Sequence, residues 1–364
     1  MDIFSDKSNR LVFGVSGSGK ATYTKDEMYQ ILTKTLRDKI VVVDIDYEYV
    51  SFAEKFGGDV ITLRLDEKMY FNICDLVIDW EDTEGCLKRK ILLLTSAIED
   101  LLPHPVWEQK DCSPEFAEAI ERCCRKMYQP YIQAMSDVRT VNEKDIPERY
   151  SYHAKECPTL KNLYDELIRD ETSAAHSIAS AIEPYAVREG SLFSHHTNVF
   201  FGFGRFTVFY LNELPEKMKP FAAKVCYSYI INEIILNHTD NVTSWVYLDV
   251  FHLYINSENA AQGIYQDFAH MKEYNSIFTG IEMDVSDILC SASGQKLFDS
   301  MGRITVFRQT NKDFKTLSEK WGLSREDKDW TEVGIGKCIL KYYGTVHCFA
   351  FEPDPVVLSI PRRG

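Results

Sequence analysis

The sequence has little that would place it in a membrane or on nucleic acid. Its most apolar stretch, Val225 to Leu236, is interrupted by Asn232 and Glu233 and falls short of the roughly 18 uncharged residues that a membrane span needs. Lys and Arg number 41 against 55 Asp and Glu, a formal net charge of −14, which disfavours binding to a phosphate backbone. The first ten residues, MDIFSDKSNR, do not resemble a signal peptide. We therefore expect a soluble, cytoplasmic chain that does not bind nucleic acid directly.

The cysteines match neither a metal site nor a disulfide framework. The ten cysteines include no CxxC pair, and the one adjacent pair is Cys123 and Cys124. Glycine and proline are also few, 18 and 12 residues, which excludes a collagen-like or low-complexity chain. A length of 364 residues predicts two domains, or one large domain with an insertion.

Short apolar runs that alternate with helical periods predict an α/β fold. We expect strands at Leu11–Phe13, Lys39–Asp44 and Asp59–Leu65, and helices at Ala21–Leu36 and Tyr49–Phe56 between them. This β-α-β-α-β order is typical of a mainly parallel sheet with right-handed crossovers and helices on its faces.

In the middle of the chain, apolar residues recur at helical spacing over long stretches. We interpret residues 80–188 as an all-helical insertion without strands, and residues 137–155 within it as a polar connector. Its expected helices are Cys86–Leu102, Pro114–Ala134, Leu160–Arg169 and Thr172–Val187. Strands are expected again at 198–201, 205–211, 244–249, 277–281 and 304–308, followed by a C-terminal hairpin over 337–351. The chain is thus divided into the first part of the core (1–79), the helical insertion (80–188) and the rest of the core (189–364).

A glycine-rich segment between the first strand and the first helix matches a P-loop. Gly14, Gly19 and Lys20 have the P-loop spacing, so backbone N–H groups and the helix N-terminus can surround phosphates while the lysine reaches the outer ones. The residue after the lysine is Ala21, which lacks the hydroxyl that normally binds Mg²⁺. Thr22 points about 100° further around the helix and is a poor substitute. The predicted nucleotide-binding residues are Gly14, Ser16, Gly17, Ser18, Gly19, Lys20, Ala21 and Thr22.

A second motif, Trp245 to His252, is an apolar strand that ends in an acid, as a Walker B segment does. Asp249 is the candidate Mg²⁺ ligand; the alternative is a buried strand that ends in a capping Asp. Val250 stands where hydrolytic proteins usually carry the Glu that acts as base, and Val cannot accept a proton. We interpret His252 as a hydrogen-bonded core histidine, because no residue near it in sequence would orient it.

Several motifs in order along the chain resemble one known family. They are GVSGSGK (14–20), VVVDIDYEY (41–49), FGGDVITL (56–63), MYQPY (127–131), PTLKNLYDEL (158–167), HHTNV (195–199), LDVFHL (248–253) and TGIEMDVSDIL (279–289). The chain resembles the C-terminal motor domain of the VirB/TrbE/TraC-type assembly ATPases of conjugative type IV secretion systems, above all Gram-positive members. The resemblance implies a RecA-like core with a helical insertion, ATP and Mg²⁺ as cofactors, and a hexameric motor at the cytoplasmic face of the membrane channel.

The chain departs from that family at further positions. Met283 stands where a Gln is expected, and His270 and Phe314 stand where arginines are expected. Arg303 and Arg308 remain as possible compensators, although we interpret them as surface arginines on a strand. Family members usually carry a large domain before the motor, whereas here the P-loop strand lies about ten residues from Met1, which is expected of a truncated chain or a motor-only paralogue.

Three functions stay open at this point. The first is a nucleotide-binding, motor-like subunit with impaired or absent hydrolysis, which acts with type IV secretion channel proteins in a homo- or hetero-hexamer at the membrane periphery. The second is a slow ATPase in which Thr22 and an acid such as Asp44, Asp46 or Glu48 replace the missing groups. The third is an interaction scaffold that binds no nucleotide. The slow ATPase is disfavoured because the chain lacks the Mg²⁺-binding hydroxyl, the catalytic base and the expected arginines. The scaffold that binds no nucleotide is disfavoured because the chain retains the P-loop glycines and Lys20.

Overall fold

One nine-stranded sheet organises the chain. The computed structural model describes residues 4, 6–66, 68–102, 114–141, 149–188, 192–199, 204–332, 334 and 336–360. The strand order is β11-β10-β9-β1-β8-β7-β2-β6-β3, and all pairs are parallel except those of β10 with β9 and with β11. The strands are β1 Arg10–Phe13, β2 Lys39–Asp44, β3 Asp59–Thr62, β6 Phe206–Tyr210, β7 Ser244–Leu248, β8 Ser276–Glu282, β9 Arg303–Val306, β10 Lys337–Tyr342 and β11 Thr345–Ala350.

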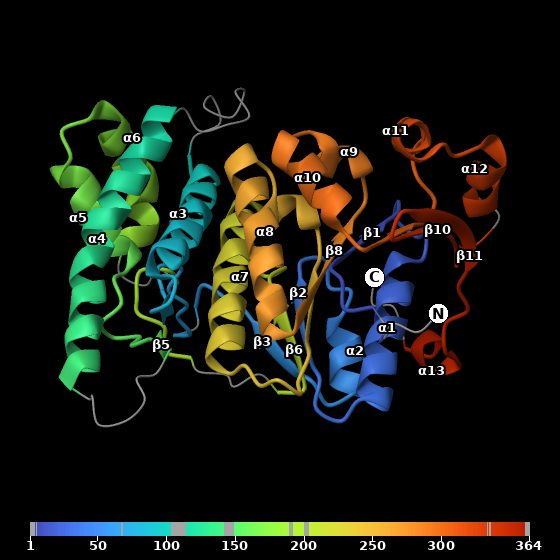
Figure 1. The fold of residues 1–364 in the computed structure, drawn as a ribbon, viewed down its shortest axis with the longest axis horizontal. Helices are drawn as coiled ribbons and strands as arrows, with labels where there is room; N and C mark the ends of the chain where they lie inside the picture. The colour runs from blue at the N-terminus through green and yellow to red at the C-terminus, as the bar shows by residue number, and fades with distance from the viewer. Residues whose placement is uncertain are drawn as a thin grey trace.

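The central strands are buried on both faces, so they are apolar throughout rather than alternating in polarity. In β2, Val41 and Val43 belong to the larger core cluster on one face, whereas Ile40 and Val42 belong to the cluster on the other. The first face is covered by α7 and α8 and the second by α1, α2 and α13 (Figure 1). The helices are α1 Lys20–Lys34, α2 Val50–Lys55, α3 Thr83–Glu99, α4 Pro114–Val141, α5 Leu160–Arg169, α6 Ser173–Ala186, α7 Lys219–Leu236, α8 Glu258–His270, α9 Val285–Leu289, α10 Ala292–Ser300, α11 Asn311–Trp321, α12 Arg325–Glu332 and α13 Pro355–Leu358, with short 3₁₀ turns η2 Glu216–Met218, η3 Phe251–Tyr254 and η4 Met271–Tyr274.

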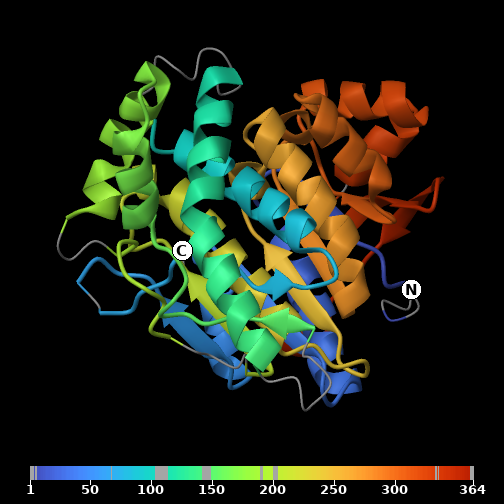
Figure 2. The same ribbon diagram turned by 60° about the vertical axis from the view of Figure 1, so that its left-hand side comes forward.

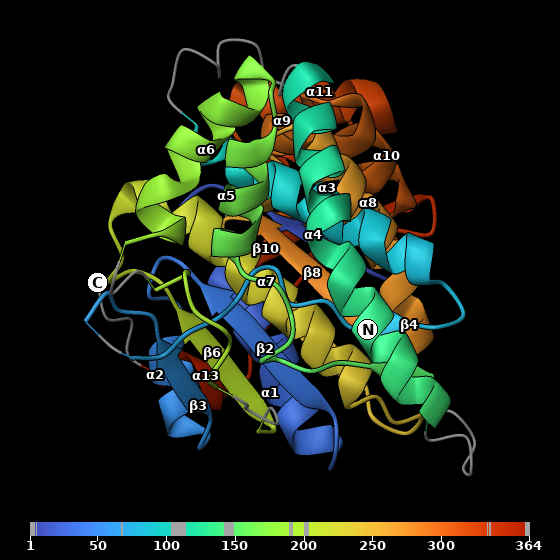
Figure 3. The ribbon, with the colours of Figure 1, turned by 90° about the vertical axis from the view of Figure 1, so that its left-hand side faces the viewer.

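Helices α3 to α6 all fall between β3 and β6 in the chain and gather on one side of the sheet. Helix α3 packs against α7 and α8, and α4, α5 and α6 pack on one another beyond it. Figure 2 and Figure 3 show this group standing over the face that carries α7. The opposite end of the sheet carries the expected C-terminal hairpin, β10 and β11, which turns at Gly344 with φ 89°.

Three expectations are corrected. The helical region contributes to a small two-stranded sheet, in which β4 (Ile78–Asp79) pairs with β5 (Tyr150–Ser151); strands of two residues leave no periodic signal. Helix α4 continues to Val141, so the polar connector begins later than predicted. Residues 198–199 form no strand, and the rest of that predicted strand lies outside the described residues. None of the helices in the described ranges is long and apolar enough to cross a membrane.

Candidate phosphate-binding site

The glycine-rich loop leaves the carboxyl end of β1 between the ends of two neighbouring strands. The Gly14 N–H donates to the Glu282 carbonyl (3.2 Å) at the end of β8, and the Val15 N–H donates to the Arg308 carbonyl (2.9 Å) just beyond β9. Gly17 has φ 72° and Gly19 has φ 109°, which only glycine adopts without strain. The loop therefore has a defined shape and leads directly into α1, whose first N–H groups have no partner within the helix.

Close packing within the loop explains a further glycine. A Cβ on Gly14 would lie 2.4 Å from Ser18 Oγ and 2.8 Å from Phe307 Cβ, too close for either contact. Ser18 itself is buried, and its hydroxyl finds no hydrogen-bond partner among the described residues. A buried hydroxyl usually has a hydrogen-bond partner, so the Ser18 hydroxyl is available to a group bound at the loop.

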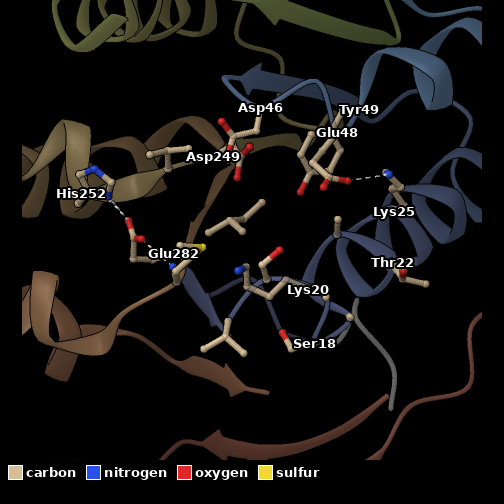
Figure 4. Close-up of a pocket in the computed structure, with 18 residues that line it drawn as sticks. Ser18, Lys20, Thr22, Lys25, Asp46, Glu48, Tyr49, Asp249, His252 and Glu282 are labelled. Atoms are coloured by element: carbon tan, nitrogen blue, oxygen red, sulfur yellow. Dashed lines mark hydrogen bonds and ion pairs between the residues drawn. The ribbon is translucent and has the colours of Figure 1, made fainter. Parts of the chain in front are cut away.

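One pocket brings the predicted residues together (Figure 4). Seven of the eight predicted residues line it, together with Asp249. Gly14 is not part of the lining, and its carbonyl accepts a hydrogen bond from Lys20 Nζ. Burial lowers the pKa of Lys20, although Asp249 and Glu282 act to raise it. The pocket lining is Val15, Ser16, Gly17, Ser18, Gly19, Lys20, Ala21, Thr22, Lys25, Asp46, Glu48, Tyr49, Asp249, Val250, His252, Ile281, Glu282 and Met283.

Asp249 follows β7 and is 8% exposed. Burial raises its pKa well above the ordinary value, and the nearby Asp44 and Asp46 raise it further. Its Oδ2 atom is buried and makes no hydrogen bond with any described residue. A buried carboxylate oxygen without a donor fits a Mg²⁺ ligand, because Mg²⁺ prefers oxygen and uses one or two carboxylates. Ala21, where the sequence predicts the loss of a Mg²⁺-binding hydroxyl, and Thr22 both line the same pocket.

The acids that precede α2 have different roles. Both oxygens of Asp44 accept backbone hydrogen bonds, from the N–H groups of Glu48 (3.0 Å) and Tyr49 (2.8 Å). Burial raises the pKa of Asp44 to about 6, although these two hydrogen bonds act to lower it. Asp44 thus fixes the turn into α2, while Asp46 and Glu48 are exposed on the pocket wall, where Glu48 pairs with Lys25 at 3.4 Å.

His252 is not a core histidine, which corrects the expectation from sequence. Its side chain is 41% exposed and lines the pocket. Its backbone N–H (2.7 Å) and its Nδ1 (2.9 Å) both contact Glu282 Oε2, and this contact raises the pKa of His252. The orienting residue lies thirty positions further on, at the end of β8, so no local signal could reveal it. Only the register of β7 on β8 brings the two together.

A metal centre at this pair is disfavoured by the hydrogen bonds already present. Donor atoms of His252, Glu282 and Asp287 lie within 4.8 Å of one another. However, Glu282 Oε2 already accepts two bonds from His252, and Oε1 accepts one from the Met283 N–H at 2.6 Å. We therefore interpret the group as a hydrogen-bonded pair.

The structure also locates other positions at which the sequence departs from the family it resembles, and it corrects one expectation. Met283 lines the pocket with its side chain 48% exposed, and Phe314 is buried in α11. Arg303 is not a surface residue: it is 2% exposed and pairs with Glu27 at 3.3 Å. It lies at the start of β9, at the end of the sheet remote from the loop. Arg308 is exposed, as expected, and its carbonyl holds the loop.

Comparisons with solved structures show which proteins share this fold. No family model and no curated protein matches the sequence. VirB4 of Thermoanaerobacter pseudethanolicus superposes with a TM-score of 0.74 and 15% identity over 96% of this chain and 91% of that one. The fold is that of the RecA-like P-loop NTPases. The plasmid coupling protein TrwB in complex with ADP and Mg²⁺ shares this RecA-like fold, with a TM-score of 0.61 and 14% identity over 100% of this chain and 89% of that one. The predicted fold class is confirmed.

Proposed function

We propose that the chain is a nucleotide-binding, motor-like subunit of a conjugative transfer machine, with impaired hydrolysis. The observation that carries the proposal is the pocket, in which the Gly17–Lys20 loop, the N-terminus of α1 and Asp249 surround one space. TrwB, which shares the fold, has been solved with ADPNP, with GDPNP and with ADP and Mg²⁺. Backbone N–H groups at a helix N-terminus together with a lysine bind phosphate irrespective of the base.

Impaired hydrolysis follows from three side chains in the pocket. Ala21 offers Mg²⁺ no hydroxyl, Val250 offers water no proton acceptor, and Met283 offers the outer phosphate no hydrogen bond. Asp249 would hold Mg²⁺ through Oδ2, which has no hydrogen-bond partner in the part of the chain that the structure describes. We therefore propose that nucleotide binds with a weakened dependence on Mg²⁺.

We propose a conjugative transfer machine because the fold is similar to that of VirB4 and to that of TrwB, which is described as a bacterial conjugative coupling protein. Here the chain would work at the cytoplasmic face of the membrane, in a homo- or hetero-hexamer with type IV secretion channel proteins, with residues 80–188 as an insertion subdomain. Light scattering with nucleotide present tests the assembly. A monomer would count against a homo-hexamer and leave a mixed ring as the proposal.

A titration with fluorescent ATP tests binding. In Lys20→Ala we expect affinity to fall roughly 10- to 150-fold, because a hydrogen bond to a charged group contributes about 1.5–3 kcal/mol. Lys161→Ala is the matched control, since Lys161 is exposed on α5 and pairs with Asp165 of the same helix. Titrations with and without Mg²⁺ measure the metal dependence. No saturable binding, or equal binding by Lys20→Ala and the control, would refute the proposal.

A further inference from the structure

The turn after Asp249 adopts a conformation that its sequence disfavours. Val250 has φ 52° and ψ 56°, in the left-handed region, where a β-branched residue is an outlier. Such a conformation is strained and persists only where the surrounding structure enforces it. Here the turn leads into η3 and brings His252 against the end of β8. The strain is thus linked to the position of one histidine in the pocket.

His252 is held by two bonds to a single buried oxygen. Its backbone N–H and its Nδ1 both contact Glu282 Oε2, at 2.7 and 2.9 Å, and Glu282 is 3% exposed. A carboxylate only accepts hydrogen bonds, so Nδ1 carries the proton of this contact. In the neutral ring, Nε2 then has the free lone pair, and within the described ranges it makes no hydrogen bond.

We propose that His252, oriented by Glu282, is the general base for hydrolysis of a nucleoside triphosphate in this pocket, in the role that Val250 cannot fill. The inference rests on the proposed function, since it requires nucleotide in the pocket. A base whose other nitrogen is fixed by a carboxylate is the arrangement that activates nucleophiles in many hydrolases. Both residues line the pocket that also contains Lys20 and Asp249, and Figure 4 shows the pair at one end of it.

The step balances as a simple displacement. The oxygen of a water forms a bond to the terminal phosphorus, and its proton moves to Nε2 of His252. The bond from that phosphorus to the bridging oxygen breaks, and the electron pair leaves with the nucleoside diphosphate. His252 then releases the proton to solvent. No oxidant, reductant or second co-reactant is needed.

The charges around His252 fix the direction of its pH dependence. Its hydrogen bond to Glu282 raises its pKa above the ordinary 6.5, and Asp287 and Asp284 act in the same direction. A base is active when unprotonated, so phosphate release should rise with pH through a pKa above 6.5.

Helices α7 and α8 also pack against η3. Their buried charged groups face other partners: Lys224 pairs with Asp100 at 2.8 Å, and Asp267 accepts a hydrogen bond from Tyr227 at 3.1 Å. Lys219 pairs with Glu216, and Glu233 accepts a hydrogen bond from Asn237 at 3.0 Å. The pH dependence of the base is therefore assigned to the acids at the end of β8 and in α9.

The test measures phosphate release against pH in the full chain, beside fluorescent-ATP binding. His252→Asn keeps a donor near the Nδ1 position but removes the lone pair, so we expect release to fall about 100-fold or more with unchanged nucleotide affinity. Glu282→Gln removes the negative charge that favours the protonated imidazole, so the pKa of His252 should fall. We therefore expect phosphate release to rise at lower pH than in wild type. His176→Asn is the matched control, because His176 is exposed on α6.

Each outcome separates the inference from the proposed function. If wild type binds nucleotide through Lys20 but His252→Asn releases phosphate as fast as His176→Asn, the inference is wrong and the proposed function stands. The inference is also wrong, and the proposed function still stands, if wild type releases phosphate no faster than Lys20→Ala. If His252→Asn loses release but the pH profile of Glu282→Gln does not move, His252 has only a structural role. If no nucleotide binds, both fail.

Discussion

Glu27 is the acid that joins the P-loop helix to the sheet. Its Oε1 accepts hydrogen bonds from Arg10 Nη1 (3.1 Å), Arg303 Nη1 (3.3 Å) and the Tyr23 hydroxyl (3.2 Å). Arg10 and Arg303 begin β1 and β9 and face each other in the parallel register. All four side chains are buried. The charges of two neighbouring strands are thus compensated by one residue of α1, about two turns after Lys20.

Glu27→Ala should destabilise the fold strongly. It removes the carboxylate that both buried guanidinium groups contact, while Asp6 still lies 3.6 Å from Arg303 Nε. Removal of one partner from a buried ion pair typically costs about 3–5 kcal/mol, because the other charge stays buried without compensation. At about 2 °C per kcal/mol, the low end for larger domains, the unfolding midpoint should fall by roughly 6–10 °C.

Thermal unfolding of wild type, Glu27→Ala and Glu54→Ala measures this effect. Glu54 is an exposed acid on α2, so its loss controls for the change of net charge. We expect the control to stay within about 0.5 kcal/mol of wild type. A midpoint for Glu27→Ala within 1 °C or so of the control would show that the buried charges are not held by Glu27, and the reasoning would fail.

Two further predictions concern the pocket. Gly14→Ala places a Cβ 2.4 Å from Ser18 Oγ and 2.8 Å from Phe307 Cβ, so it should abolish fluorescent-ATP binding. Gly263→Ala on α8, whose Cβ would lie 3.6 Å from Leu92, should bind normally, and a loss in both variants would contradict a local effect. Ala21→Ser restores the hydroxyl for Mg²⁺, so nucleotide affinity should become more Mg²⁺-dependent, and Ala21→Ser with Val250→Glu should release phosphate faster than wild type. If the double variant releases phosphate no faster than wild type, the impaired hydrolysis is caused instead by the apolar Met283 and the missing arginines.

The sheet could be predicted where single strands carry their own signal. The run Lys39–Asp44 is β-branched and ends in an acid, and it forms β2 at those residues. The loop could be predicted because only glycine tolerates the backbone angles of Gly17 and Gly19. Both signals are local, since they depend on a few adjacent residues and on sterics that hold in any fold.

Contacts across the sheet could not be predicted in this way. Arg303 looks like any arginine on a strand, and its burial depends on Glu27, which lies far back in the chain on α1. No residue near His252 in sequence would orient it, because its partner Glu282 belongs to another strand. In both cases the register of parallel strands decides the environment of a charge, and a single sequence contains no direct record of that register.

The pocket has two walls of opposite charge, and together they constrain its ligand. The loop side presents the Lys20 ammonium and the N-terminus of α1, which favour an anion. The opposite side presents Asp46 and Asp249, which would repel a bare anion at this range. Lys25 does not neutralise that side, because it is already paired with Glu48. A ligand that satisfies both walls carries phosphate toward the loop and a cation toward Asp249. We infer that the pocket still favours phosphate with a divalent cation over phosphate alone, but less strongly than it would with a hydroxyl in place of Ala21.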